Sequence, residues 1–413
     1  MKNISLTFKI HYPVRLKKYH FFDIGNDDYY YDDFENERII RKAADECLLP
    51  ANEVLLNLLK KHKGQFKVSF AISGTAIDLF GLYAPEVIES FQRLSATGCV
   101  EFLGETYVHS LASIKDNEEF KRQVEAHAGK IEELFGQRPR VFKNTELIYS
   151  DKIGEIVAGM GFKAVLTEGA RHILKSKSPN HLYCNAINPD LKILLNNTSL
   201  SENIAFRFSN PDWTGWPTTA NSYLSTLNKM TDDEKIVNIL LDYEMVGKGQ
   251  KNTAGIYNFM KSFPQTLYEM TEFGFMTPSE VVCYNQPIAS LNVPETISAA
   301  PYERDLSPFL NNDLQEEALT KLYELKAKID HSSDPNLLKD WQYLQTSDHF
   351  RYMFGKQLPN IDQHGASNPY DNFYEAFMNY MNVLNDFSIR INRSIARIKS
   401  DFVLKNFHHK IAI

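Results

Sequence analysis

The feature that most constrains this fold is an alternation of short apolar runs with longer amphipathic segments over about the first 285 residues. Short runs rich in β-branched and aromatic residues indicate strands, and apolar residues spaced three and four apart indicate helices. Strands that alternate with helices are typical of an α/β fold with parallel strands. About seven such units predict a barrel that is complete or lacks one strand. The expected strands are residues 4–10, 66–72, 100–103, 163–167, 191–195 and 236–241, with another that begins at Val141 and Phe142.

The pattern changes after Val282. Residues 286–308 are rich in proline and have no strong period, which is typical of a linker or an extended cover. Helical spacing dominates from about Leu314 onwards, as in a helical bundle. We therefore expect a barrel over residues 1–285, a linker or cover over 286–308 and a C-terminal helical bundle over 309–413.

Composition excludes several classes of protein. Hydrophobic residues make up 43% of the 413-residue chain and charged residues 23%, which is a globular composition. The net charge is −7 without a basic stripe, so a nucleic-acid partner is not expected. The four cysteines are scattered with no CxxC, which argues against a zinc ribbon and a disulfide framework. With no signal peptide and no apolar run of about 18 residues, we expect a soluble, cytoplasmic protein with no membrane partner.

Polar and charged residues gather where the expected strands end, which is where α/β barrels carry their chemistry. Asp242 and Glu244 are two apart, so in an extended strand their side chains face the same side. Taken singly, Glu146 could be a helix-entry residue, Asp242 a cap and His11 a core histidine. Together on one rim they favour a functional site. The candidates are His11, Glu101, Glu105, His109, Glu146, Asp242 and Glu244.

Two carboxylates on either side of one bond are the groups that hydrolyse glycosides. A nucleotide enzyme would instead carry a GxGxxG or a P-loop, and the sequence has neither. A metallohydrolase would carry a histidine-rich ligand set, but no HxxxH or HExxH spacing occurs. We therefore expect no metal and no cofactor.

Five short motifs in order resemble those of glycoside hydrolase family 57, in its α-amylase-like branch. They are His11-Tyr12-Pro13, Gly98–Glu101, Lys143–Tyr149, Leu241–Gly247 and Thr346–Met353. Residues 207–217, 276–282 and 368–387 are similar to the same branch, so the resemblance covers nearly the whole chain.

The resemblance implies an α/β fold that is an incomplete (β/α)7 TIM-like barrel followed by an α-helical domain, and a retaining mechanism without a metal. It implies that Glu146 is the nucleophile and Asp242 the general acid/base, with carboxyl groups roughly 5–5.5 Å apart. It also places Asp348 and His349 at the substrate site, so that the helical domain would contribute to the active site. The implied substrate is an α-1,4-glucan such as starch, glycogen, maltodextrin or a maltooligosaccharide.

The chain departs from the family pattern at several positions. Tyr12 stands where glutamine is usual, Val108 where tyrosine is frequent, and residues 245–249 read Met-Val-Gly-Lys-Gly instead of Thr-Phe-Gly-Glu-His. These changes bear on the substrate range. Three alternatives stay open: a 4-α-glucanotransferase or branching enzyme with the same carboxylates, a non-catalytic glucan-binding protein, and a metal-dependent deacetylase on a similar barrel. Trp213 and Trp216 could stack on sugars or pack in the core.

Overall fold

The computed structural model describes residues 2–208, 210, 212–216, 218–246, 253–300, 304–355 and 368–411, without the side chains of 253, 254 and 398–411. The chain forms two compact units, which are described in turn. The first comprises Met1–Tyr12, Glu37–Leu306 and Leu358–Ser367, and the second comprises Pro13–Asn36, Ser307–Gln357 and Asn368–Ile413.

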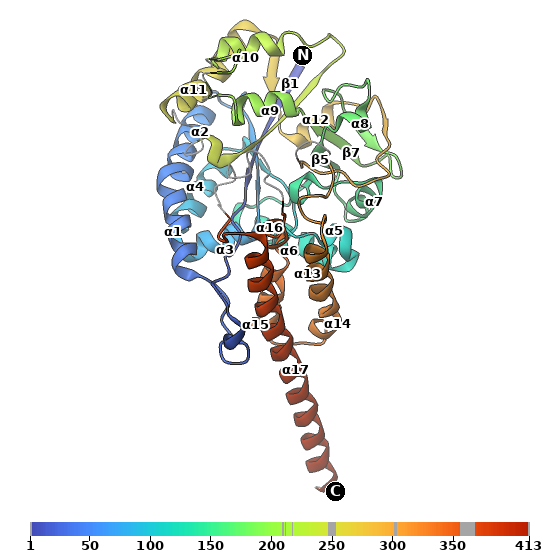
Figure 1. Ribbon diagram of the computed structural model, residues 1–413. Helices are drawn as coiled ribbons and strands as arrows, with labels where there is room; N and C mark the ends of the chain where they lie inside the picture. The colour runs from blue at the N-terminus through green and yellow to red at the C-terminus, as the bar shows by residue number, and fades with distance from the viewer. Residues whose placement is uncertain are drawn as a thin grey trace. The chain divides into compact units, whose positions relative to one another are not determined.

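The first unit is an α/β structure built on a mostly parallel sheet (Figure 1). All seven expected strands are present, and three further strands of three residues each were not expected. The strands are β1 (Lys2–Ile10), β2 (Val68–Ile72), β3 (Val100–Phe102), β4 (Val141–Lys143), β5 (Ala164–Glu168), β6 (Tyr183–Asn185), β7 (Lys192–Asn196), β8 (Ile236–Asp242), β9 (Phe273–Phe275) and β10 (Ala289–Leu291).

Strand β1 lies between β2 and β8 and is parallel to both. Parallel pairs also join β2 to β3, β4 to β5, β5 to β7 and β7 to β8, while β6 is antiparallel to β7. Gly104, just after β3, forms a parallel bridge to Phe142 of β4. Because these strands are parallel, their carboxyl ends meet at one edge.

Helices connect the strands of the first unit, and α2 and α4 lie on the opposite side of β1 from α7 in Figure 1. Gly136 ends α6 in a left-handed conformation with φ 69°. The helices are α1 (Asp33–Ala43), α2 (Leu49–Lys61), α3 (Gly74–Tyr83), α4 (Pro85–Ser95), α5 (Ala112–Lys115), α6 (Asn117–Phe135), α7 (Asp151–Gly159), α8 (Arg171–Leu174), α9 (Thr198–Ala205), α10 (Ala220–Leu227), α11 (Thr253–Met270) and α12 (Pro278–Tyr284), with short turns η2 (Ala44–Leu48), η3 (Thr145–Leu147) and η4 (Tyr243–Val246).

The alternation of β1 separates a packed face from a polar face. Phe8 packs against Phe70 and Tyr243, with ring centroids 5.6 and 5.0 Å apart, and Phe70 packs in turn against Phe91 of α4. Side chains one residue away point to the other side of a strand. Lys9 therefore lies on the opposite face of β1 from Phe8, on the side where the candidate site forms.

The second unit is mainly helical. Tyr31 donates to Asp340 over 2.6 Å, Arg390 donates to the same carboxylate over 2.8 Å, and Tyr30 donates to Asp386 over 2.7 Å. These bonds join the segment 13–36 to two helices of the bundle. The helices are α13 (Asp313–Glu324), α14 (Lys326–Ile329), α15 (Pro335–Leu344), α16 (Ser347–Tyr352) and α17 (Phe373–Ile411), with the short turn η1 (Phe21–Asp23). Throughout the part of the chain that the structure describes, no helix has both the length and the apolar character needed to cross a membrane.

Candidate functional site

Glu146 has an unusual backbone conformation at the carboxyl end of β4. It has φ 43° and ψ 36°, and Leu147 follows with φ 55°. Residues other than glycine rarely adopt this left-handed region, and each instance costs about 1–3 kcal/mol. Strain of this kind persists only where the surrounding structure holds it in place.

The backbone of residues 293–299 supports this strained turn. The carbonyl oxygen of Glu146 accepts a hydrogen bond from the N–H of Ala299 over 2.8 Å. Tyr149 and Ile297 exchange two backbone hydrogen bonds of 3.0 and 2.9 Å. The N–H of Val293 donates to the Asp151 carboxylate over 2.7 Å. Segment 293–299 therefore runs beside residues 146–151 and fixes their path.

The carboxylates of Glu146 and Asp242 are brought together by Lys9, which sequence reasoning did not select. The Nζ atom of Lys9 lies 3.3 Å from Oε1 of Glu146 and 3.9 Å from Oδ2 of Asp242. Lys9 and Asp242 are direct partners in the register of β1 and β8. A signal was present, since Lys9 is two residues before His11 and so shares its face of an extended strand.

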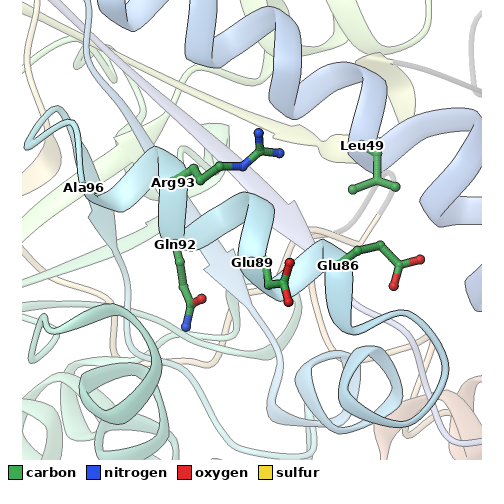
Figure 2. A pocket seen from close by; sticks show the side chains of 6 residues that line it. All are labelled: Leu49, Glu86, Glu89, Gln92, Arg93 and Ala96. Atoms are coloured by element: carbon green, nitrogen blue, oxygen red, sulfur yellow. The ribbon is translucent and has the colours of Figure 1, made fainter.

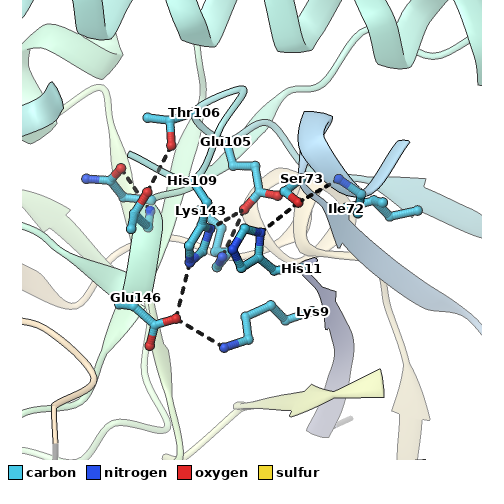
Figure 3. Close-up of polar contacts among 12 residues, drawn as sticks. Lys9, His11, Ile72, Ser73, Glu105, Thr106, His109, Lys143 and Glu146 are labelled. Carbon is cyan, nitrogen blue, oxygen red and sulfur yellow. Dashed lines mark hydrogen bonds and ion pairs between the residues drawn. The ribbon is translucent and has the colours of Figure 1, made fainter. Parts of the chain in front are cut away.

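Two histidines lie beside Glu146, as Figure 3 shows. The Nε2 atom of His109 is 3.2 Å from Oε1 of Glu146. The ring of His11 stacks on the ring of His109 with centroids 4.0 Å apart, and its Nδ1 is 2.8 Å from the Ser73 hydroxyl. The predicted residues His11 and His109 thus contact each other, and His109 contacts the candidate nucleophile.

Glu105 is fully buried behind His109. Its carboxylate accepts a hydrogen bond from Lys143 over 2.9 Å and lies 3.8 Å from Nδ1 of His109. Burial would raise the pKa of Glu105, but the positive charge of Lys143, with contributions from His109 and His127, holds that pKa well below its usual range. An ionised Glu105 can orient His109, which in turn contacts Glu146.

Glu244 and Tyr12 form a second buried polar pair. The Tyr12 hydroxyl donates to Oε1 of Glu244 over 2.5 Å, and the backbone N–H of Glu244 donates to Asp242 over 3.2 Å. Burial, and then the charge of Glu244, raise the pKa of the Tyr12 hydroxyl well above its usual value. The tyrosine that departs from the family pattern therefore contacts a residue next to the candidate acid/base.

Other predicted residues lie elsewhere. Glu101 accepts hydrogen bonds from the backbone and the hydroxyl of Ser279, over 2.9 and 2.5 Å, at the start of α12. Asp348 and His349 are buried in α16 of the second unit, and their contribution to the site stays a prediction. Residues 247–249, where the chain departs from the family, lie outside the described residues. Trp216 is half exposed. The guanidinium carbon of Arg207 lies 5.9 Å from the centroid of the Trp213 ring.

Glu168 is a buried carboxylate at the end of β5 that the sequence reasoning also missed. It accepts hydrogen bonds from Thr198 and from Asn196, the latter over 3.3 Å, and lies 4.0 Å from Arg304. Burial raises its pKa, with Arg304 acting in the opposite direction. The expected strand stopped at Thr167, one residue before this carboxylate, although it follows the same strand-end pattern as Glu146.

Neither a metal site nor the surface depression of Figure 2 competes with this cluster. Among the described residues, no group of three or more His, Cys, Asp or Glu side chains is placed to hold a metal ion. The depression lies along α4 beside the start of α2, and none of the candidate site residues lines it. Its lining residues are Leu49, Glu86, Glu89, Gln92, Arg93 and Ala96 (Figure 2).

Comparison with known proteins gives consistent matches. The model of "Glycosyl hydrolase family 57" matches residues 5–294. A protein of Methanocaldococcus jannaschii named "Putative alpha-amylase" is 35% identical over 412 residues, which covers 96% of this chain and 86% of that protein. A branching enzyme from Thermococcus kodakaraensis has a TM-score of 0.68 at 12% identity, covering 94% of this chain and 89% of that one. The α-amylase AmyC from Thermotoga maritima has a TM-score of 0.64 at 14% identity, covering 94% and 93%.

Proposed function

Because the chain belongs to glycosyl hydrolase family 57 and is therefore a glycoside hydrolase, we propose that it hydrolyses α-1,4-glucans with retention of configuration. The α-amylase name of the M. jannaschii relative supports a starch, glycogen or maltodextrin substrate. The arrangement that carries the proposal is the placement of the Glu146 and Asp242 carboxylates within 4 Å of the same Lys9 ammonium group.

In this proposal Glu146 attacks the anomeric carbon and forms a glycosyl-enzyme intermediate. Asp242 first protonates the leaving glycosidic oxygen and then removes a proton from the water that hydrolyses the intermediate. Both carboxylates approach the same Nζ atom, so the distance between the facing oxygens cannot exceed the sum of the two contact distances. A separation of about 5–5.5 Å, as retaining enzymes require, falls within that bound.

The surrounding residues would bind and orient the sugar. His11, His109 and Glu244 lie next to the two carboxylates and offer donors and acceptors for hydroxyl groups. We propose substrate-binding roles for these three and for Glu101, Glu105, Asp348 and His349, without a metal or cofactor. Glu105, which is buried and paired with Lys143, would act through His109.

The same proposal extends to the architecture. The parallel pairings run from β8 through β1, β2 and β3 to β4, β5 and β7, and β7 pairs with β8 again. We propose that this ring is an incomplete (β/α)7 barrel over residues 1–285, followed by a linker or cover at 286–308 and a helical bundle at 309–413 that contributes to the active site. The four free cysteines support a reducing, cytoplasmic setting.

The test is a product time course on maltoheptaose followed by NMR, for the wild type, Glu146→Gln and Asp242→Asn. We expect early α-anomeric products from the wild type and a loss of at least about a hundredfold in kcat for each variant. Glu155→Gln, an exposed isosteric change on α7, is the matched control and should keep full activity. Glucan binding without turnover by the wild type would contradict the proposal and indicate a binding protein. Products longer than the input would indicate a transferase or branching enzyme with the same carboxylates.

A further inference from the structure

The ammonium group of Lys9 contacts both of the candidate catalytic carboxylates. Its Nζ atom lies within 4 Å of carboxylate oxygens from two different chain segments, η3 and β8. We infer that Lys9 is a positioning residue, whose ammonium group holds Glu146 and Asp242 together in the resting site and favours the ionised form of both. The catalytic roles of the two carboxylates rest on the proposed function, whereas the contacts of Lys9 do not.

The backbone fixes where the Lys9 ammonium group can go. Lys9 is paired in register with Ala71 of β2 and Asp242 of β8, and parallel neighbours are about 4.8 Å apart. The exposed fractions of the side chains are 12% for Lys9, 15% for Glu146 and 17% for Asp242. Charges with so little contact with water are stabilised by charged or polar partners. Lys9 and the two carboxylates supply them to each other.

Among the described residues, several other charged or titratable groups face the pair. His109 faces Glu146 from the loop after β3, and the backbone N–H of Glu244 faces Asp242 from η4. On the far side of His109, Lys143 pairs with Glu105. Glu244 in turn accepts from Tyr12. Lys9 is thus a cation shared by both catalytic candidates, while Lys143 pairs with a different carboxylate.

This arrangement has a consequence for catalysis. A cation within about 4–6 Å favours the ionised form of a carboxyl group and lowers its pKa by about 1–3. The general acid must carry a proton when the glycosidic bond breaks, and the nucleophile must not. Lys9 therefore favours a reactive nucleophile and makes the proton on Asp242 easier to lose. Loss of its charge should move both limbs of the pH–rate profile to higher pH.

The experiment compares pH profiles of kcat/KM on maltoheptaose for the wild type, Lys9→Met and Lys9→Arg. We expect both limbs of Lys9→Met to lie about 1–3 pH units higher, whereas Lys9→Arg keeps the charge and stays close to the wild type. Lys2→Met removes a lysine from the start of the same strand, where Lys2 contacts Met230 and Asp232, and is the control. A wild-type profile for Lys9→Met, or an equal shift in Lys9→Arg, would overturn the inference.

A second readout does not depend on activity. In protein labelled with ¹³C at the carboxyl carbons, the resonances of Asp242 and Glu146 are assigned by their loss in Asp242→Asn and Glu146→Gln. Their titration midpoints should rise in Lys9→Met, even if the wild type proves inactive on glucans. A wild type that is inactive, with midpoints that rise in Lys9→Met, would contradict the proposed function and support the inference about Lys9. An active wild type, with midpoints that do not change in Lys9→Met, would support the proposed function and contradict the inference. If Lys9→Met does not fold, Lys9→Gln replaces it in both measurements.

Discussion

The N–H of Ala299 donates to the carbonyl oxygen of Glu146 over 2.8 Å, although the two residues are far apart in the chain. Glu146 and Leu147 both have positive φ, at a cost of about 1–3 kcal/mol each. The hydrogen bond from Ala299, with the Tyr149–Ile297 pair, offsets part of that cost. The turn that projects the candidate nucleophile is thus held by a segment outside the strands.

Replacement of Ala299 by proline should lower activity, because proline has no N–H to donate to Glu146. We expect kcat on maltoheptaose to fall by about tenfold or more, since small displacements at a catalytic group are costly. Ala299→Gly keeps the N–H and is the matched control, with activity close to the wild type. Equal activity in Ala299→Pro and Ala299→Gly would show that this hydrogen bond does not position Glu146.

The strand-end residues could be predicted because strands leave a pattern in the sequence. Residues 4–10 and 236–241 alternate or run apolar, so the positions after them, His11 and Asp242, stand out as polar residues on a predicted rim. Glu146 follows a strand that is short but flanked by clear helices. The parallel pairing then brings these strand ends to one edge of the sheet.

Other parts of the site left little or no signal. The support from segment 293–299 is made by backbone groups, which every residue carries, so no side-chain pattern marks it. Lys9 occupies one of the polar positions of an alternating strand. Solvent-facing residues produce the same alternation, so the pattern does not mark Lys9 as a site residue. The register with β8, which the sequence does not reveal, places Lys9 opposite Asp242.

Replacement of Lys143 by methionine should destabilise the first unit, because it leaves the Glu105 carboxylate buried without its main charge partner. The side chains of Lys143 and Glu105 are 0% and 1% exposed, and breaking such a pair costs about 3–5 kcal/mol. We expect a loss of that size in the free energy of unfolding at pH 7, measured in urea.

The pH dependence of this loss has a definite sign. Because the folded-state pKa of Glu105 is depressed, its contribution to stability is present above the unfolded pKa of about 4.3 and is lost as the pH falls. The penalty in Lys143→Met should therefore shrink toward pH 4, where Glu105 can take up a proton. The double variant with Glu105→Gln should recover much of the loss at pH 7. A penalty that is equal at both pH values would contradict the ion-pair explanation.

Replacement of Gly154, which lies in α7, by alanine should destabilise the protein. A Cβ at Gly154 would lie 2.4 Å from Nδ2 of Asn185 and 2.7 Å from the Tyr149 hydroxyl, which are hydrogen-bonded to each other. Neither buried group can move freely, so we expect a loss of about 1–3 kcal/mol, measured by urea unfolding. Gly159→Ala, in the same helix and with no atom within 4 Å of its Cβ, should be neutral or stabilising. Equal effects of the two changes would refute the steric explanation.

His349 should make stability fall between pH 6.5 and pH 4. Its ring is buried in α16, and burial lowers its pKa from 6.5 to about 4, with Asp348 acting in the opposite direction. Below pH 6.5 the unfolded chain binds a proton at this histidine that the folded chain does not bind. The free energy of unfolding is therefore highest above pH 6.5 and decreases below it. At about 1.4 kcal/mol for each pKa unit, the loss by pH 4 is on the order of 3 kcal/mol.

His349→Gln cannot take up that proton, so its Tm should vary less with pH over this range. His331→Gln, an exposed histidine of the same unit, is the control and should keep the wild-type slope; an unchanged slope in His349→Gln would mean that His349 is already charged in the folded protein.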